Sequence, residues 1–209
     1  MRFIAAPLLL SGLIALSGCA GMSESQCLAS DWRTIGYRDG LNGTQSTALL
    51  RHQNACIKHN VRPDREAYLA GWREGVHQYC DPSNAFNVGE RGAAYGNVCP
   101  PEMQEGFNSA YQEGRRLYLA QSELNQIHRA ISEREQRLKD VKSELAAIAG
   151  YMIDSGATPG ERAEMLLNAK DLAQEQGRLE GEIEDLKAEA AVKAERLENL
   201  RHNIAMTAY

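Results

Sequence analysis

The sequence predicts an all-α protein: a small disulfide-stapled helical domain with a long antiparallel coiled-coil hairpin. Three patterns indicate this fold. Cysteines end at position 99, glycines and aromatic residues recur at helical spacing up to about position 118, and leucine or isoleucine then recurs every seven residues. The 209 residues are 43% hydrophobic and 24% charged, which is ordinary for a globular protein. Because the net charge is −5 and no basic patch occurs, we expect no nucleic acid partner.

Residues 1–18 are predicted to be a lipoprotein signal peptide. A positive start precedes an apolar run, Phe3–Leu16, which is short for a membrane span of about 20 residues. The Leu-Ser-Gly-Cys tetrapeptide ending at Cys19 resembles the lipobox of bacterial lipoproteins, which implies cleavage before Cys19 and its acylation. An ordinary signal peptide or an uncleaved anchor is the alternative.

The residues after Cys19 are expected to form a lipidated tether, 19–26. Ala20 and Gly21 stand where lipoproteins retained in the inner membrane often carry aspartate. By resemblance, this implies an outer-membrane protein that faces the periplasm and contacts the membrane through its lipid.

Four further cysteines, an even number, fit an oxidising compartment in which disulfides form. They allow three pairings. Antiparallel helices at 29–41 and 45–58 would bring Cys27 close to Cys56. Cys80 would lie at the end of the next helix, roughly 24 Å from the start of that helix and so too far from Cys56 for a disulfide. Cys80 and Cys99 stand at the two ends of the following loop. The predicted pairs are Cys27–Cys56 and Cys80–Cys99.

The region 27–118 is predicted to be a helical domain organised around Tyr68–Tyr79. Aromatic residues and glycines of this stretch share one helix face, and 107–118 repeats the pattern. Gly36–Gly40 repeats the glycine spacing of Gly71–Gly75 over a shorter stretch. Glycine inside a helix costs roughly 1 kcal/mol relative to alanine, so we expect these glycines to permit close helix packing. A ligand that approaches the backbone is the alternative.

The other elements of this domain follow from start and stop signals. Gly40 or Gly43 is expected to end the first helix, and Pro63–Glu66 to begin the helix 63–79. Asp81–Val98 is rich in Gly, Asn, Pro and Ser and has no period, so we expect a loop there. Pro100–Glu102 is expected to open the last helix.

Residues 27–118 resemble the DUF2799 family of bacterial lipoproteins, a family of unknown function. The resemblance supports an exported lipoprotein and supplies no catalytic residues. It rests on these spaced positions: Asp31, Trp32, Ile35, Gly36, Asp39, Gly40, Ala55, Cys56, Pro63, Asp64, Tyr68, Gly71, Gly75, Tyr79, Cys80, Gly89, Gly92, Tyr95, Val98, Cys99, Pro100, Tyr111 and Gly114.

Two residue sets in this domain have the side chains of a possible chemical site. Cys56 with His59 and His77 with Cys80 would suit tetrahedral zinc, but two cysteines would be left over, so we expect no metal or other cofactor. Acids that precede glycines, Asp39, Glu74 and Glu113, are expected to be solvated or paired with Arg38, Arg73 or Arg115. No nucleophile elbow or phosphate loop occurs, so we expect no enzyme.

Aromatic residues of the same domain form a candidate binding surface. In a groove they would bind a glycan or a peptidoglycan fragment, although core positions are the simpler interpretation. The candidates are Trp32, Tyr37, Tyr68, Trp72, Tyr95 and Tyr111.

The region 119–209 is predicted to be a coiled-coil helical hairpin with its turn at about 154–160. Leucine or isoleucine recurs every seven residues from Leu117 to Leu145, Met152 continues the series, and a 3–4 spacing resumes at Leu172. Arg134, Gln176 and Lys193 interrupt the seam. Thr158–Glu161 has the pattern of a capping box, and the short turn makes the helices antiparallel.

Together these patterns predict a non-enzymatic, lipid-anchored envelope protein with a structural or adaptor role. Its periplasmic coiled coil would contact another envelope protein, and association into a homo-oligomer is also open. The alternative is a periplasmic module that binds a glycan, a peptidoglycan fragment or a metal through its aromatic and glycine-bearing helices. A hydrolase is the third hypothesis.

Overall fold

The computed structural model describes residues 22–154 and 156–207. The predicted signal peptide, Cys19 and the start of the tether lie outside the described residues. The described residues are 84% helical and contain no strand, which confirms the all-α class. None of the helices in these ranges is long and apolar enough to cross a bilayer.

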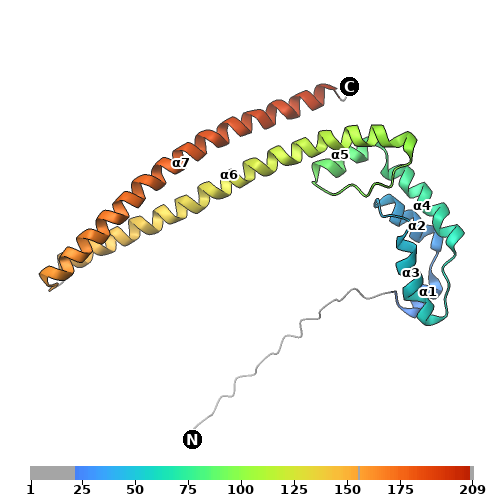
Figure 1. Ribbon diagram of the computed structural model, residues 1–209, viewed down its shortest axis with the longest axis horizontal. Helices are drawn as coiled ribbons and strands as arrows, with labels where there is room; N and C mark the ends of the chain where they lie inside the picture. Colours follow the sequence, from blue (N-terminus) through green and yellow to red (C-terminus); the bar gives the residue numbers. More distant parts are fainter. Residues whose placement is uncertain (1–21, 155, 208–209) are drawn as a thin grey trace, which may run out of the picture. The chain divides into compact units, whose positions relative to one another are not determined.

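Figure 1 shows the helices in chain order. They are α1 (Glu24–Ala29), α2 (Trp32–Leu41), α3 (Ala48–Cys56) with a 3₁₀ turn at Ile57–His59, α4 (Arg65–Tyr79), α5 (Pro82–Glu90), α6 (Pro101–Asp154) and α7 (Pro159–Thr207).

Two of these helices lie in segments for which the sequence predicted a tether and a loop. Helix α1 lies partly in the predicted tether, because Ser23 and Gln26 form a capping box at its start. Helix α5 lies in the predicted loop, where Asp81 accepts a hydrogen bond from the backbone N–H of Ser83 and proline occupies the first turn. The expectation of a loop was therefore wrong at Pro82–Glu90.

The chain divides into two compact units. The first holds the described residues up to Tyr79 together with Gly96–Cys99, and the second holds Cys80–Tyr95 and the chain from Pro100 onward. This division differs from the boundary expected at residue 118, because α5 packs on the start of α6 and so joins the hairpin.

In the first unit, α2 and α4 touch backbone to backbone. A Cβ atom added at Gly36 would lie 1.9 Å from the carbonyl oxygen of Tyr68, and one added at Gly71 would lie 1.9 Å from that of Arg33. A Cβ atom added at Gly40 or Gly75 would lie 2.2 Å or 2.1 Å from a carbonyl oxygen of the other helix. The predicted role of these glycines in close packing is confirmed, and the two similar Gly-x3-Gly segments prove to be each other's partners.

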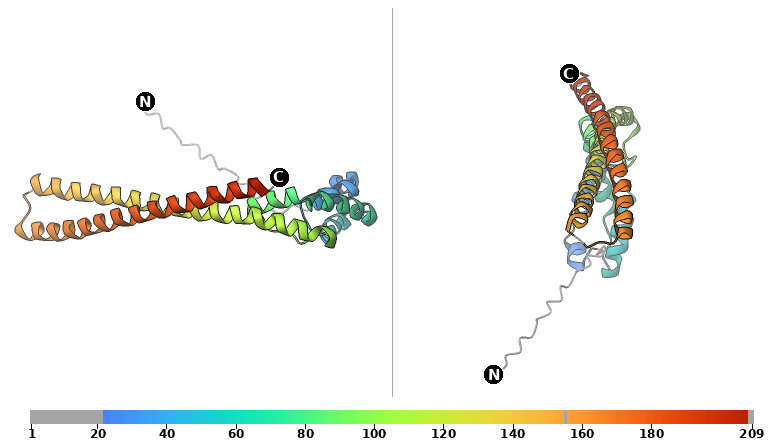
Figure 2. Two further views of the ribbon diagram at one scale, coloured as in Figure 1. Left: turned by 90° about the horizontal axis from the view of Figure 1, so that it is seen from above. Right: turned by 90° about the vertical axis from the view of Figure 1, so that its left-hand side faces the viewer.

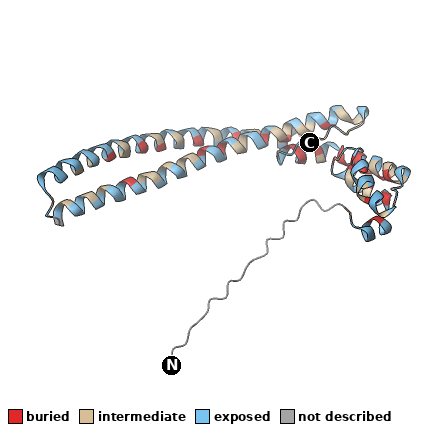
Figure 3. Ribbon diagram, turned by 60° about the horizontal axis from the view of Figure 1, so that its bottom comes forward, coloured by how far each residue is buried: buried red, intermediate tan, exposed pale blue. Residues whose placement is uncertain are grey.

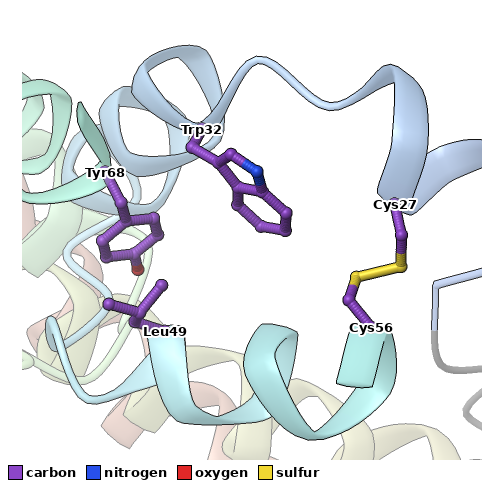
Figure 4. Close-up of a cluster of buried hydrophobic side chains, with 5 residues drawn as sticks. All are labelled: Cys27, Trp32, Leu49, Cys56 and Tyr68. Carbon is purple, nitrogen blue, oxygen red and sulfur yellow. A yellow bond between two sulfur atoms is a disulfide. The ribbon is translucent and has the colours of Figure 1, made fainter. Parts of the chain in front are cut away.

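A disulfide closes the core of the first unit. Cys27 and Cys56 are bonded, with their Cα atoms 5.6 Å apart, and they pack in one cluster with Trp32, Leu49 and Tyr68 (Figure 4). Cys80 and Cys99 form the second disulfide. Both predicted pairings are confirmed.

The second unit repeats the helix-pair geometry of the first. A Cβ atom at Gly89 of α5 would lie 2.2 Å from the carbonyl oxygen of Tyr111, and one at Gly114 of α6 would lie 2.1 Å from that of Phe86. The pair α5–α6 therefore corresponds to the pair α2–α4, with Gly89 in the place of Gly40.

The loops after the first helix of each pair also correspond. Gly43 has a φ of +66° and faces the ring of Tyr79, while Gly92 has a φ of +70° and faces the ring of Tyr118. The left-handed backbone at both positions favours glycine. Next to them, Trp72 Nε1 donates to the carbonyl oxygen of Thr44, and the Tyr111 hydroxyl donates to that of Ala93. The chain thus holds two copies of one helix-pair module.

Helices α6 and α7 form the predicted antiparallel hairpin (Figure 2). Buried residues face each other along it, as Figure 3 shows in red, and form two clusters. They are Leu117, Leu124, Ile127, Ala190 and Leu197, then Val141, Leu172 and Leu179. The predicted capping box is present: Thr158 N–H donates to Glu161 at 2.7 Å, and Glu161 N–H donates to the Thr158 hydroxyl.

Ion pairs between α6 and α7 flank this seam over its middle section. Arg134, which interrupts the apolar pattern, is half-buried and donates to Glu182 at 3.2 Å. Arg137 binds both carboxylate oxygens of Glu175, which is the strongest geometry for such a pair. Lys193 pairs with Glu123. Arg134 and Lys193 are therefore satisfied across the hairpin, and Gln176 donates a hydrogen bond to Glu180 on its own helix.

Candidate functional site

Three helices of the first unit bring a tyrosine, an aspartate and a histidine together. The ring of Tyr68 on α4 is completely buried, and its hydroxyl donates to Asp39 Oδ2 on α2 at 2.7 Å. His52 Nε2 on α3 lies 3.0 Å from the same oxygen. Because α2 and α4 touch at their glycines, the Tyr68 side chain can reach Asp39. None of these contacts follows from local sequence spacing.

The protonation of this group follows from its hydrogen bonds. Burial, together with the hydrogen bond to Asp39, raises the pKa of Tyr68, so its hydroxyl stays a donor at neutral pH. A carboxylate oxygen only accepts, so His52 Nε2 carries the proton that points at Asp39. The ring of His52 packs at 6.3 Å from Trp32 and 6.0 Å from Tyr68, centroid to centroid. The imidazole is thereby fixed in orientation.

The second module shows that this polar group is not needed for packing. At the positions that correspond to Asp39 and Tyr68 it has Val88 and Phe107, both buried. Burying a carboxylate is costly unless it is hydrogen-bonded, whereas valine and phenylalanine fill the same places without that cost. The geometry of the helix pair therefore does not require the polar residues of the first module.

An open cavity of about 570 Å³ lies against this cluster. Its walls come from α1, one face of α2, and α3. The lining residues are Met22, Gln26, Ala29, Ser30, Asp31, Thr34, Ile35, Arg38, Asp39 and His52. The volume falls within the range of small-molecule sites.

The acids that precede glycines have other partners than those predicted. Asp39 pairs with His52 and Tyr68 in place of Arg38, and Glu74 pairs with Arg33 in place of Arg73. The expectation of a solvated acid or a local ion pair was therefore wrong for Asp39, whereas Glu74 is solvent-exposed as expected, with Arg33 as its ion-pair partner. The functional residue that sequence reasoning missed is His52, because its partners are 13 and 16 residues away along the chain and lie on other helices.

Two of the six aromatic candidates are core residues, and the other four are half-buried. Trp32 and Tyr68 are buried, so neither ring is open to a ligand, and Trp72 is half-buried. Tyr37 donates to Gln78 at 2.9 Å. In the second unit, Tyr95 and Tyr111 pack on Phe107, with ring centroids 4.5 Å and 6.2 Å away. A binding role for the exposed parts of Tyr37, Trp72, Tyr95 and Tyr111 stays a prediction.

The two cysteines of the candidate zinc site are not free thiols. Cys56 is bonded to Cys27, and Cys80 is bonded to Cys99. A thiolate is the ligand that zinc requires from cysteine, so these two residues cannot supply it while oxidised.

The turn end of the hairpin, which we call the tip, has a different surface from the rest. The segment Leu145–Ile153 contains no charged residue. Large apolar side chains are exposed on both helices there: Tyr151 at 51%, Ile153 at 87%, Leu166 at 57% and Leu167 at 64%. In the described part of the hairpin, the cross-helix ion pairs end at Lys142–Glu180 and Arg137–Glu175, before the tip.

Comparison with known proteins identifies one family. No curated protein and no solved structure matches the chain. Residues 31–116 match the family described as protein of unknown function (DUF2799). The matched range begins at the N-cap of α2 and runs into α6, so it spans both helix-pair modules. Residues 31–116 of this chain therefore form a DUF2799 domain, as the sequence resemblance predicted.

Proposed function

We propose that this protein is a non-enzymatic, lipid-anchored adaptor of the bacterial envelope. Acylated Cys19 would hold it in the outer membrane, facing the periplasm, and the hairpin α6–α7 would contact another envelope protein through its tip. The lipobox-like tetrapeptide ending at Cys19 supports the anchor. Three acyl chains exceed the two signals that stable anchoring requires.

The observation that carries the adaptor role is the apolar tip. Most of the hairpin is charged and held by cross-helix ion pairs, yet four large apolar side chains are exposed where the helices turn. An exposed apolar cluster is unfavourable in water and typically marks a binding surface. Leu166 and Leu167 face solvent on α7 while Met165 and Leu172 lie in the seam direction, so the exposed pair is additional to what the hairpin itself needs.

We also propose that the hairpin is an intramolecular coiled coil. The seven-residue spacing of the seam supports left-handed supercoiling. Arg134 and Lys193 at seam positions and Ala190 in the seam make it a weak zipper, so pairing between chains is the competing arrangement. Light scattering on the delipidated protein separates them: a mass near 23.1 kDa less the signal peptide supports the monomer, and twice that mass refutes it.

The adaptor role is tested by photo-cross-linking in living cells. A photoreactive residue replaces Leu167 at the tip or, as the matched control, Gln126, which is exposed on the side of α6. We expect a cross-linked product with one envelope protein from the tip position alone. The product should disappear when Ile153→Glu is added. Equal products from both positions, or none from the tip, would refute the proposal.

A further inference from the structure

We propose that the cavity against α2 in the first unit binds a small zwitterion, an amino acid or a short peptide. Asp39 would hold the ammonium group of this ligand and Arg38 its carboxylate. The inference does not depend on the adaptor role of the hairpin, which concerns the other unit.

Arg38 supplies an uncompensated positive charge to the cavity wall. No carboxylate of the described chain lies within 4.0 Å of its guanidinium, and it donates no hydrogen bond to any described residue. Asp31, the other acid of the cavity besides Asp39, is already engaged, because it accepts from Arg33 N–H and from the Thr34 hydroxyl. A guanidinium with five donors is the side chain best matched to a carboxylate. The Arg38 group is therefore available for a ligand carboxylate.

Asp39 supplies a negative charge with one acceptor still open. Tyr68 and His52 both bind Oδ2, and Oδ1 has no partner among the described side chains and backbone groups. The side chain retains 20% of its exposure, and the residue lines the cavity. Since two donors already fix the carboxylate, little conformational entropy remains to be lost when Oδ1 accepts a hydrogen bond. An ammonium group fits this acceptor.

The two charges are neighbours that do not neutralise each other. Consecutive residues on a helix point about 100° apart, so Arg38 and Asp39 line the same cavity without facing one another. A ligand that carries both charges can satisfy both at once. A simple anion would meet Arg38 but also the carboxylates of Asp31 and Asp39, and a simple cation would meet Arg38. The wall therefore favours a zwitterion over either single ion.

The apolar part of the cavity suits the rest of such a ligand. Met22, Ala29 and Ile35 lie on its lining beside the charged pair. A small side chain placed against them would be removed from water, which adds affinity in proportion to the area covered. The ligand class is therefore a zwitterion with a small, partly apolar body.

The second helix-pair module supplies an internal comparison. Its residues at the corresponding positions are Asn87 and Val88, so both charges are absent. The module nevertheless keeps the glycine contacts and the turn at Gly92. The charged pair is therefore present in only one of the two modules, and the glycine contacts of the helix pair form without it.

The test measures binding to the full-length chain by calorimetry, with alanyl-alanine as the zwitterionic probe. N-acetylated alanyl-alanine lacks the ammonium group, and alanyl-alanine amide lacks the carboxylate. We expect each analogue to bind at least about tenfold more weakly than the parent, because each loses a hydrogen bond between charged groups. Acetate serves as the probe for a plain anion site.

The variants Arg38→Asn and Asp39→Val introduce the residues of the second module. Each should weaken alanyl-alanine binding about tenfold or more. The control Arg73→Asn, at an exposed arginine of α4 outside the cavity, should leave it unchanged. If Asp39→Val does not fold, binding to Arg38→Asn and binding of the two analogues still test whether the cavity recognises a zwitterion.

Three results would overturn the proposal. The first is no binding of alanyl-alanine up to about 10 mM, a concentration above which binding would be too weak to matter. The second is an analogue that binds as well as the parent. The third is acetate competing as strongly as alanyl-alanine, which would make the cavity a plain anion site.

Discussion

Replacing Gly36 by alanine should separate the two helices on which the first unit depends. The added Cβ atom would lie 1.9 Å from the carbonyl oxygen of Tyr68, 2.8 Å from its carbonyl carbon and 3.0 Å from the backbone nitrogen of Trp72. All three are backbone atoms, so no side chain can turn aside. The oxygen must withdraw by more than 1 Å, that is, from 1.9 Å to at least 3.0 Å.

The expected cost follows from two opposing effects. Overpacking a close contact typically destabilises by 1–3 kcal/mol, and about 3 kcal/mol or more is expected where backbone must move. Alanine in place of glycine inside a helix stabilises the helix by about 1 kcal/mol. We therefore expect Gly36→Ala to lower the free energy of unfolding of the first unit by about 2 kcal/mol or more.

The hairpin offers a matched control at Gly177. It also lies inside a helix, but a Cβ atom added there would meet nothing within 4 Å. Only the propensity effect remains, so Gly177→Ala should stabilise the hairpin by roughly 0.5–1 kcal/mol. Glycine to alanine is thus expected to lower the free energy of unfolding at position 36 and to raise it at position 177.

Urea unfolding separates the two effects within one protein. Both tryptophans, Trp32 and Trp72, lie in the first unit, so their fluorescence reports its unfolding, while circular dichroism is dominated by the long helices α6 and α7. Gly36→Ala should lower the fluorescence midpoint, and Gly177→Ala should raise the dichroism midpoint. An unchanged or higher fluorescence midpoint for Gly36→Ala would refute the close-contact reasoning.

Three further outcomes are expected. Tyr68→Phe should lower the fluorescence midpoint by the equivalent of about 1–2 kcal/mol, because Asp39 loses a donor; an unchanged midpoint would count against the hydrogen bond. The hydrogen bonds from Arg137 lower the pKa of Glu175, so this group stabilises the hairpin above the unfolded pKa of about 4.3 and the stabilisation is lost as the pH falls below it. The melting temperature, followed by circular dichroism from pH 7 to pH 3, should therefore decrease less for Glu175→Gln than for the parent. Equal decreases in the melting temperature of the two proteins would contradict this. Cys19→Ser should move the protein from the membrane to the soluble fraction on cell fractionation, and continued membrane association would refute the lipid anchor.

Helix α5 shows why part of the fold escaped prediction. Its sequence, Pro-Ser-Asn-Ala-Phe-Asn-Val-Gly-Glu, combines residues that favour turns, so local propensity predicts a loop. The helix forms because Asp81 caps it and because Gly89 touches the backbone of α6 at Tyr111. Tertiary packing thus outweighs propensity. The missed signal was the spacing of Gly89 and Gly92, which equals that of Gly40 and Gly43.

The elements that were predicted correctly have local causes. The hairpin follows from a seven-residue apolar repeat and from the capping box at Thr158–Glu161, both of which are readable in a few turns of sequence. The disulfide pairs followed from helix lengths. The cluster of Asp39, His52 and Tyr68 had no such local cause, because its members lie on three different helices and meet only after α2 and α4 have packed.

Helix α6 is one uninterrupted element of 54 residues, about 80 Å long at 1.5 Å per residue. Its first turns carry Gly114, locked against α5, and its last turns carry the apolar tip. A force applied at the tip would act along α6 on the contact between Gly114 and the backbone of Phe86. Because that contact is between backbone atoms, no side chain there can rearrange when α6 tilts against α5.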